Sequence, residues 1–298
     1  MMRIASIGFA VVVLACRGAE PPAALPALAP GATWFDDWYA VTKLDEHTFA
    51  IAEPRYDQHN VNYLLVGDTR AVLFDTGPGV RDIRPVVAAL TDRPVTTAFS
   101  HLHYDHIAGQ PDFESIASLD HPSIRSRVAS DGRFTPSLLQ HGRAGRPSFC
   151  ITEWWEPDAH IDLGGRVLQA LSVPGHTPES LALYDAERGQ LFSGDYLYPG
   201  DLFAFGPGSD LVAYRDTARR LLDLVADRPG IAIYGAHVPS PSTSPRQGAP
   251  DLARLESALD ELLGDPAHIR PWTLMRFAWI PTRRYDFGDG LVILAPLF

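Results

Sequence analysis

Short apolar runs, punctuated by Gly, Pro, Asp and Ser, recur along the chain. Many of them are rich in Val, Ile, Leu and Tyr, and runs of this kind are typical of strands that are buried on both faces. The pattern therefore predicts strands at residues 61–66, 71–75, 95–99, 167–173, 181–184, 191–193, 231–234 and 291–294.

Segments with the spacing of a helix alternate with these strands. Apolar residues recur at helical spacing over 83–90, over 211–226 after the candidate N-cap Asp210, and over 252–263 after Asp251. Alternating strands and helices predict an α/β fold, and the order of elements fits a sandwich of two sheets with helices on the outside.

One long segment, 110–160, lacks a clear period and contains Trp154 and Trp155. We expect loops and short helices over this segment because neither the strand nor the helix period is sustained. We also expect it to lie over the candidate site described next.

Four residues that make good metal ligands follow a predicted strand directly. They lie in the run Ser-His-Leu-His-Tyr-Asp-His at 100–106. His101 and His103 are two residues apart, so in an extended chain their imidazoles point to the same side and can bind one ion. Asp105 and His106 lie beyond the point where the chain must turn, so they can face a second ion. Imidazole and carboxylate suit zinc, and also iron or manganese.

Three further possible ligands lie beside turn-forming residues at the ends of other predicted strands. Pro-Gly precedes His176, Gly precedes Asp195, and Gly-Ala precedes His237. A single histidine beside a strand is more often an ordinary core or surface residue. Seven possible ligands at four turn-flanked strand ends favour a metal site instead, because all of these ends can converge on one point.

This pattern resembles the metallo-β-lactamase-fold hydrolase superfamily, whose signature is H-x-H-x-D-H followed by a distant His, Asp and His. The resemblance covers roughly residues 49–239, and the stretch Phe-Asp-Thr-Gly-Pro-Gly at 74–79 looks like the family's early strand and turn. It implies an α/β fold of four layers, an αβ/βα sandwich, and a site with two Zn²⁺ ions, Fe or Mn being alternatives.

The resemblance also implies a role for each residue. The first metal would be held by His101, His103 and His176, the second by Asp105, His106 and His237, and Asp195 would bridge the two. Asp75 would not bind a metal itself but would order the loop that carries the ligands at 101–106. The remaining histidines are expected to be ordinary, although His59 precedes a strand beside the site and is the least ordinary of them: His47, His59, His121, His141, His160 and His268.

The implied activity is that of a metal-dependent hydrolase. Two metal ions lower the pKa of a bridging water, so a metal-bridging hydroxide can attack an acyl bond at working pH. Asp105 would orient this nucleophile and pass a proton to the leaving group. We therefore regard Asp105 as catalytic as well as metal-binding.

Tyr198 is the second candidate catalytic residue. It lies three residues after Asp195, a spacing similar to that of the acyl-homoserine lactonases, where a tyrosine hydrogen-bonds the lactone carbonyl. A phenol there would stabilise an oxyanion; alternatively, Tyr198 only packs with neighbouring aromatic residues. Residues 201–205 and the tryptophans suggest an apolar rim, so a small, largely apolar lactone or ester fits best.

Three alternative activities stay open. For β-lactam hydrolysis, many true β-lactamases carry Cys or Ser where Asp195 stands, and the Cys type has a Lys shortly after it that binds the carboxylate of the drug. Here residues 196–200 contain no Lys. In thioester hydrolysis, glyoxalase-type enzymes share the bridging Asp but usually have a basic C-terminal helical region, whereas this chain ends with a strand-like segment. For iron-dependent oxidative chemistry, the flavin-linked di-iron proteins of this fold normally need an appended flavodoxin domain, for which we expect no room. The persulfide dioxygenases bind one metal and are cytosolic or organellar, which conflicts with the leader described next.

The N-terminus predicts export. A short basic start, an apolar run at 4–14 and the small Ala15 make a secretory signal, because the run is far shorter than the ~20 residues of a membrane span. The sequence Val-Leu-Ala-Cys at 13–16 resembles a bacterial lipobox, in which Cys16 would carry a lipid anchor. Plain secretion with a chance cysteine is the alternative.

These features divide the chain into a signal peptide or lipobox at 1–16, a Pro/Ala-rich tether at 17–33 and a catalytic domain at 34–298. We predict a periplasmic protein or a membrane-anchored bacterial lipoprotein, with Cys16 as its only link to the membrane. The mature domain would have no internal disulfide, because Cys150 is the only other cysteine.

Net charge argues against a polyanionic partner. The chain has 25 basic and 36 acidic residues, a formal charge of −11, and Lys43 is its only lysine. Nucleic acid would be repelled overall, so we expect a small-molecule substrate and no nucleic-acid partner. The sequence leaves the oligomeric state open.

Overall fold

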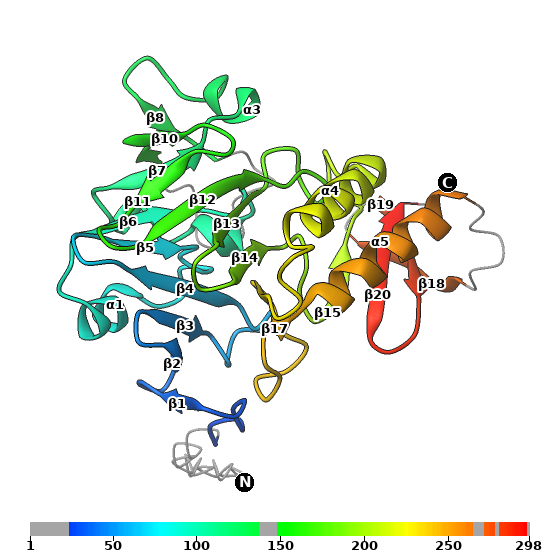
Figure 1. Cartoon of the computed structure of the whole chain (residues 1–298), viewed down its shortest axis with the longest axis horizontal. Coiled ribbons are helices and arrows are strands. Elements are labelled where there is room, and N and C mark those ends of the chain that lie inside the picture. Colours follow the sequence, from blue (N-terminus) through cyan, green and yellow to red (C-terminus); the bar gives the residue numbers. More distant parts are fainter. Residues whose placement is uncertain (1–23, 137–147, 265–270, 278–279, 297–298) are drawn as a thin grey trace, which may run out of the picture.

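The computed structural model describes residues 24–136, 148–264, 271–277 and 280–296, and it has the predicted α/β sandwich (Figure 1). The first sheet has the order β1-β2-β3-β4-β5-β6-β7-β10. Its strands are β1 (Ala32–Trp34), β2 (Ala40–Asp45), β3 (Thr48–Ala52), β4 (Val61–Val66), β5 (Ala71–Phe74), β6 (Val95–Ala98), β7 (Ile116–Leu119) and β10 (Glu153–Trp155). β1 to β5 pair antiparallel, and β5, β6, β7 and β10 pair parallel.

The second sheet has the order β11-β12-β13-β14-β16-β17. Its strands are β11 (His160–Asp162), β12 (Val167–Ser172), β13 (Leu181–Asp185), β14 (Gln190–Gly194), β16 (Ala232–Gly235) and β17 (Arg246–Gln247). The inner faces of both sheets share one apolar core, in which Tyr63 and Phe74 of the first sheet meet Phe192 and Tyr234 of the second. Buried apolar area of this kind is the main force that holds two sheets together.

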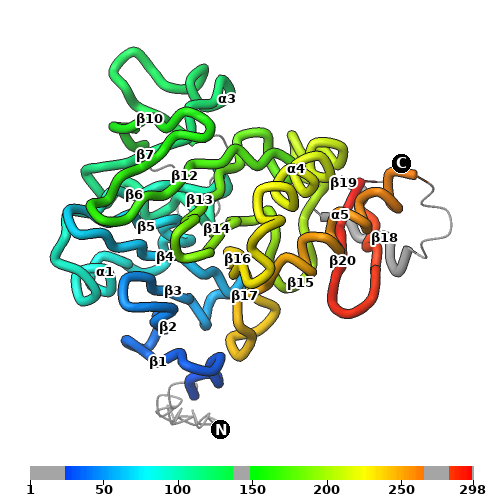
Figure 2. Tube along the Cα trace, viewed as in Figure 1, coloured from blue at the N-terminus to red at the C-terminus, as the bar shows by residue number. Residues whose placement is uncertain are grey.

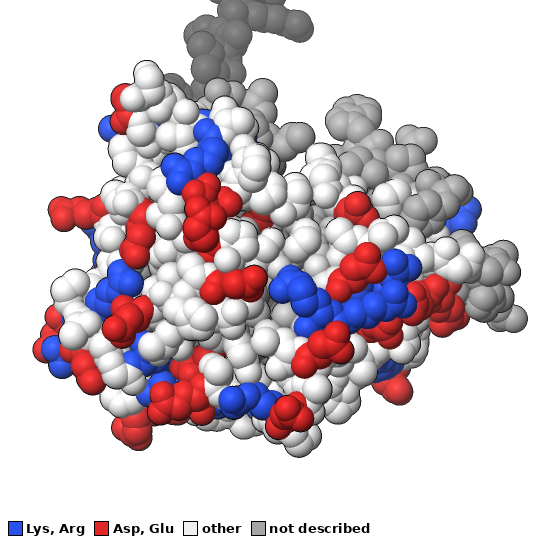
Figure 3. Space-filling view, turned by 45° about the horizontal axis from the view of Figure 1, so that its top comes forward, with Lys and Arg blue, Asp and Glu red and all other residues white. Residues whose placement is uncertain are grey.

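Helices cover both outer faces and complete the four layers. α1 (Arg84–Leu90) packs Val86 and Val87 against the outer face of the first sheet. α4 (Leu211–Leu224) and α5 (Ala249–Gly264) cover the second sheet, as Figure 1 shows. Arg219 of α4 donates to Glu256 and Asp260 of α5, and on the face seen in Figure 3 basic and acidic side chains are interspersed. None of the described helices has the length and apolarity needed to cross a membrane.

One predicted helix start is confirmed and another is wrong. Asp210 caps α4 as expected, since its carboxylate accepts hydrogen bonds from the amides of Val212 and Ala213 at 2.8 and 3.0 Å. The prediction that Asp251 precedes its helix is wrong, because α5 begins two residues earlier, at Ala249. The Asp251 carboxylate instead reaches back and accepts from the amide of Gly248 at 2.8 Å, so it still satisfies a free donor at the helix start.

A third, four-stranded sheet lies beside α5, at the end of the molecule away from α1 (Figures 1 and 2). Its order is β15-β20-β19-β18, from β15 (Gly200–Phe203), β18 (Pro271–Phe277), β19 (Ile280–Asp286) and β20 (Leu291–Pro296). Of these, only the core of β20 was predicted. Tyr285 and Ile293 pack into the same core as Leu255 and Leu259 of α5, so this sheet is joined to the sandwich through the helix layer.

The expectation of loops and short helices over 110–160 is wrong in part. The short helical elements exist, as do two small strands: η1 (Gln110–Asp112), α3 (Pro122–Arg125), β8 (Arg133–Phe134) and β9 (Phe149–Cys150). However, β7 and β10 extend the first sheet, and Trp155 is buried in the core between the sheets. The apolar rim expected from the tryptophans and from 201–205 is also wrong for Trp155, Leu202 and Ala204, which are core residues.

A buried ion pair links the two sheets away from this core. Arg166 and Asp185 are both about fully buried, and the Arg166 Nε lies 2.8 Å from an Asp185 oxygen. The same guanidinium donates to the carbonyl of His47 at 2.8 Å and to the hydroxyl of Thr48 at 3.0 Å, in the hairpin between β2 and β3. One cation therefore joins the second sheet to the first.

Removal of the Asp185 carboxylate tests this connection. We expect Asp185→Ala to lower the free energy of unfolding by about 3–5 kcal/mol, because a guanidinium would be left buried without its counter-charge. Urea denaturation measures the change. Asp82→Ala is the control, since Asp82 pairs with Arg84 on the surface and such pairs contribute about 0–1 kcal/mol. Equal losses in the two variants would contradict a special role for the buried pair.

Candidate metal centre

The seven predicted ligands come from the segments that follow β6, β12, β14 and β16, and two of them, Asp105 and His106, lie in the short helix α2 (Tyr104–Ile107). β6 belongs to the first sheet and the other three strands to the second, so the site lies where the two sheets meet. Gly194 allows this approach: a Cβ built on it would lie 2.5 Å from the Cβ of Ser100, and its φ is +55°. Only glycine adopts this conformation readily and leaves room for the neighbouring loop.

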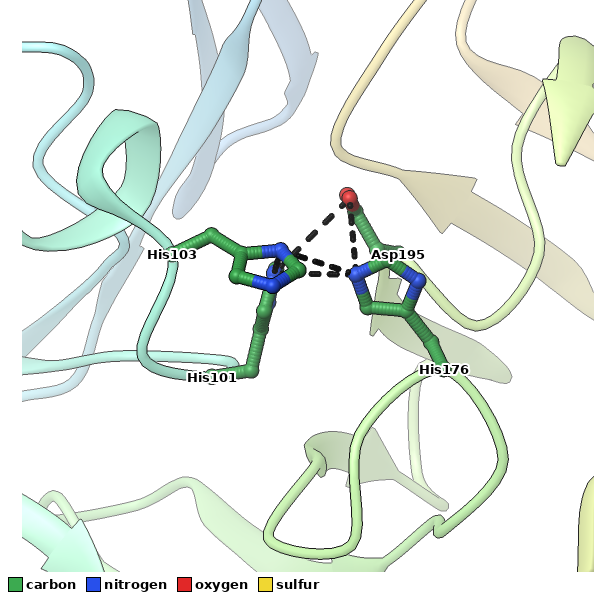
Figure 4. Close-up of side chains that lie close together, drawn as sticks. All are labelled: His101, His103, His176 and Asp195. Carbon is green, nitrogen blue, oxygen red and sulfur yellow. Dashed lines mark hydrogen bonds and ion pairs between the residues drawn. The ribbon is translucent and has the colours of Figure 1, made fainter. Parts of the chain in front are cut away.

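His101, His103, His176 and Asp195 form the first cluster (Figure 4). Nε2 of His101 lies 2.8 Å from Nδ1 of His103, and Nε2 of His176 lies 3.2 and 3.0 Å from these two atoms. Oδ2 of Asp195 lies 3.8 Å from the His101 nitrogen and 3.6 Å from the His176 nitrogen. Four ligand atoms therefore point at one another around a common centre.

Asp105, His106 and His237 form the second cluster. Oδ2 of Asp105 lies 3.3 Å from Nε2 of His106 and 3.5 Å from Nε2 of His237. Oδ1 of Asp195 lies 3.5 and 3.1 Å from the same two nitrogens. One oxygen of Asp195 thus faces each cluster, and the structure brings all seven predicted residues together.

Two observations show that divalent cations fit this arrangement. Nε2 of His106 and Oδ1 of Asp195 are buried without a hydrogen-bond partner, which is costly unless another group binds them. The donors also have the right type and spacing, since tetrahedral ligands at the usual zinc distances lie about 3.3 Å apart. The two clusters can therefore each hold an ion, with Asp195 shared between them.

Hydrogen bonds from the Nδ1 atoms of His176 and His237 orient these two imidazoles. Nδ1 of His176 lies 2.6 Å from the carbonyl of Phe203, and Nδ1 of His237 lies 3.0 Å from the carbonyl of Gln58. Because a carbonyl only accepts, each of these Nδ1 atoms must carry a proton, so Nε2 is the nitrogen that can bind an ion.

Asp75 and Ser100 order the ligand run in the same way. Asp75 accepts from Nδ1 of His106 at 2.8 Å, from the Ser100 amide at 2.6 Å and from the Ser100 hydroxyl at 2.9 Å. The Ser100 hydroxyl is then left to accept from Nδ1 of His101 at 3.0 Å. Asp75 holds this position at a φ of +65°, a conformation that is uncommon outside glycine.

The two clusters differ in their electrostatics. Burial lowers the pKa of His101 well below its usual value and that of His103 to about 4, and neighbouring imidazoles add to this effect. Burial also opposes the charged form of His106 and His237, but nearby carboxylates, Asp105 and Asp195 among them, outweigh it and raise the pKa of both imidazoles. Without an ion, the surroundings therefore favour the neutral form of His101 and His103 and the protonated form of His106 and His237.

Tyr198 lies beside the second cluster but is turned away from it. Its ring packs edge-on against His237 with centroids 5.3 Å apart, while its hydroxyl donates to the carbonyl of Asp201 at 2.8 Å. His59 is not part of either cluster, and its Nδ1 lies 3.3 Å from the carbonyl of Val238. His47, His121 and His160 are also outside the clusters, and His141 and His268 lie outside the described residues.

Sequence reasoning missed Gln58, Asn60 and Ser100 as supporting residues. Asn60 donates to the backbone and side chain of Asp105. Ser100 directly precedes the ligand run, and that adjacency was a signal. Gln58 and Asn60 are far from the ligands in sequence, so no local pattern points to them.

Comparison with known proteins identifies relatives. The family model described as metallo-beta-lactamase superfamily matches residues 56–237. Acyl-coenzyme A thioesterase MBLAC2 of Bos taurus is 30% identical over 216 residues, which cover 63% of this chain and 77% of that protein. Hydroxyacylglutathione hydrolase of Xanthomonas euvesicatoria pv. vesicatoria is 29% identical over 153 residues, which cover 50% of this chain and 50% of that protein.

A solved structure supports the fold. The metallo-beta-lactamase from Pontibacter korlensis aligns with a TM-score of 0.57 at 16% identity, over 74% of this chain and 99% of that chain. At this identity the likeness concerns the fold alone.

The contrast between the clusters predicts two different pH dependences of metal binding. We expect the affinity of the second cluster to rise between pH 6 and 8, by about tenfold per pH unit for each proton that His106 and His237 release on binding. The affinity of the first cluster should change little over that range, since His101 and His103 are already neutral. Zinc titration against a chromophoric chelator at several pH values measures both. The same slope for both ions would contradict the assignment.

Proposed function

The chain belongs to the metallo-beta-lactamase superfamily of metal-dependent hydrolases, and from this premise we propose that it cleaves an acyl bond of a small, largely apolar substrate with two bound cations. The observation that carries the proposal is Asp195, whose two oxygens each face one three-residue ligand set. The donor set suits zinc best, and iron or manganese are the alternatives.

Asp105 is the residue to which we assign proton transfer during hydrolysis. When bound, two such ions acidify a water between them and polarise the acyl carbonyl. Oδ2 of Asp105 faces His106 and His237, whereas its Oδ1 accepts no hydrogen bond from any described residue. That free oxygen is available to take a proton from the nucleophile and to deliver it to the leaving group.

Acyl thioesters are the substrate class that we place first. The names of the bovine and Xanthomonas relatives describe removal of an acyl group from a thiol carrier, coenzyme A or glutathione. A thiol with a pKa of about 8.5 leaves readily, so it needs less help from a proton donor than an alcohol does. This suits a site in which Asp105 is the one described side chain that we assign to proton transfer.

Lactones and oxygen esters are the second candidate, and Tyr198 is the observation that favours them. Its ring lies against His237, and its hydroxyl would have to leave the Asp201 carbonyl in order to reach a substrate at the cluster. A phenol in that position would stabilise the oxyanion of a lactone. β-Lactam hydrolysis and iron-dependent oxidation rank lower: no Lys follows Asp195 at 196–200, and the chain offers two ligand groups, whereas the persulfide-oxidising type of this fold uses a single metal.

Export is a separate part of the proposal. It is supported by the leader at 1–16 and the lipobox-like run that ends at Cys16. Residues 1–23 lie outside the described residues, so the proposal depends on the sequence alone.

A substrate panel tests the proposed reaction. With zinc-loaded protein we expect kcat/KM for a short acyl thioester to exceed that for the matched oxygen ester, an acyl-homoserine lactone and nitrocefin by about tenfold or more, a difference of about 1.4 kcal/mol in activation free energy. Thiol release and ester or lactone opening are followed in parallel. Preference for the lactone would favour the second candidate, and preference for nitrocefin would overturn both. A single bound iron in protein purified without added metal would argue against hydrolysis.

Tyr198→Phe separates the two leading candidates. We expect thioester turnover to stay within about threefold of wild type and the unfolding free energy to fall by about 1 kcal/mol, because the hydroxyl donates to the Asp201 carbonyl. If the tyrosine instead supplies an oxyanion donor, lactone turnover falls by at least about tenfold. Steady-state kinetics on both substrates, with thermal unfolding of both proteins, distinguish these outcomes.

A further inference from the structure

The connection between β3 and β4, residues 53–60, lies against the second cluster. The carbonyl of Gln58 accepts from Nδ1 of His237 at 3.0 Å. The backbone of Asn60 forms an isolated antiparallel bridge with His237, and the amide of Val61 donates to the carbonyl of Ala236 at 2.8 Å. This connection therefore positions the loop that carries one ligand of the second cluster.

The Asn60 side chain reaches a second ligand of the same cluster. It is 1% exposed, and its Nδ2 donates to the carbonyl of Asp105 at 2.9 Å and to Oδ2 of Asp105 at 3.2 Å. Reversing the amide would place its oxygen against these two acceptors, so the donor end is fixed by chemistry. Its Oδ1 has no partner, which means that the contacts with Asp105 are what hold this buried side chain.

These contacts make the two oxygens of Asp105 different. Oδ2 receives the Asn60 amide and faces His106 and His237, while Oδ1 receives no hydrogen bond from the described residues. We propose that Asn60 is a positioning residue, which holds Asp105 so that Oδ2 is presented to the second ion and Oδ1 is left for the nucleophilic water. The inference rests on the two-ion centre of the proposed function and not on the substrate class.

Other contacts fix the connection relative to the ligand run. The hydroxyl of Tyr104, which lies between His103 and Asp105, donates to Oε1 of Gln58 at 2.7 Å. The hydroxyl of Tyr56 lies 3.1 Å from that of Tyr104 and can donate to it. Because the connection is tied at Gln58 as well, loss of the Asn60 amide would free the Asp105 side chain without releasing the whole segment.

Asn62, which lies two residues farther along the chain in β4, is a matched control. It is also 1% exposed, and its Nδ2 donates to the carbonyl of Ile51 at 3.3 Å and to Oε1 of Glu53 at 3.2 Å. It contacts no metal ligand. Truncation of either asparagine removes a buried amide with two hydrogen bonds, so a purely structural effect should be similar in the two variants.

The experiment is a zinc titration of metal-free protein with wild type, Asn60→Ala and Asn62→Ala, read by a competing chelator and repeated with cobalt(II) to follow its visible spectrum. We expect Asn60→Ala to weaken the second ion by about 10–100-fold and to leave the first within about threefold. Asn62→Ala should bind both ions as wild type does, with a similar loss of thermal stability. At saturating zinc, Asn60→Ala should lower kcat with little change in KM.

The possible failures are distinguishable. Wild-type protein that binds a single ion overturns the proposed two-ion function itself. Wild-type protein that binds two ions, together with an Asn60→Ala variant that binds both normally or loses both equally, overturns the role of Asn60. If Asn60→Ala does not fold, Asn60→Ser takes its place: its hydroxyl is too short to reach Oδ2 of Asp105, so we expect the same selective loss, and normal binding of both ions would again reject the inference.

Discussion

The shared carboxylate of Asp195 is the constraint on which the site depends. Its two oxygens can face two ligand sets only if loops from both sheets meet within a few ångströms, and Gly194 makes that approach sterically possible. The common core between the sheets and the buried Arg166–Asp185 pair hold the sheets in this alignment. Packing far from the metal centre therefore sets how closely the ligands from the first sheet approach those from the second.

The distribution of charge makes the two clusters unequal. The first cluster is built mainly from imidazoles, and burial favours the neutral form of His101 and His103, whose lone pairs are then available to an ion. The second cluster contains Asp105 and also faces Asp195, and these carboxylates favour protonated imidazoles when no cation is present. A cation bound in the second cluster would replace these protons, and the ionised carboxylate of Asp105 would then be able to accept a proton during hydrolysis.

Local signals explain what could be predicted. The eight strands and three helices predicted from apolar periodicity are present, and the ligands could be found because each lies at a strand end beside a turn. β7 and β10 were missed because their apolar runs are short and are interrupted by polar residues, so only pairing with β6 reveals them. Asn60 was missed because its partner, Asp105, is 45 residues away, and such contacts exist only in the folded chain.

The third sheet shows why chemistry is easier to infer than substrate. β15 pairs with β20, which lies beyond the family-matched residues 56–237, yet the carbonyl of Phe203 in β15 orients His176 of the first cluster. The same strand supplies the Asp201 carbonyl that turns the Tyr198 hydroxyl away from the second cluster. β15, which is held by pairing with the C-terminal β20, thus sets both the tautomer of His176 and the direction of a candidate oxyanion donor. Ligand identity follows from local sequence, whereas the shape that selects a substrate depends on pairing between distant strands.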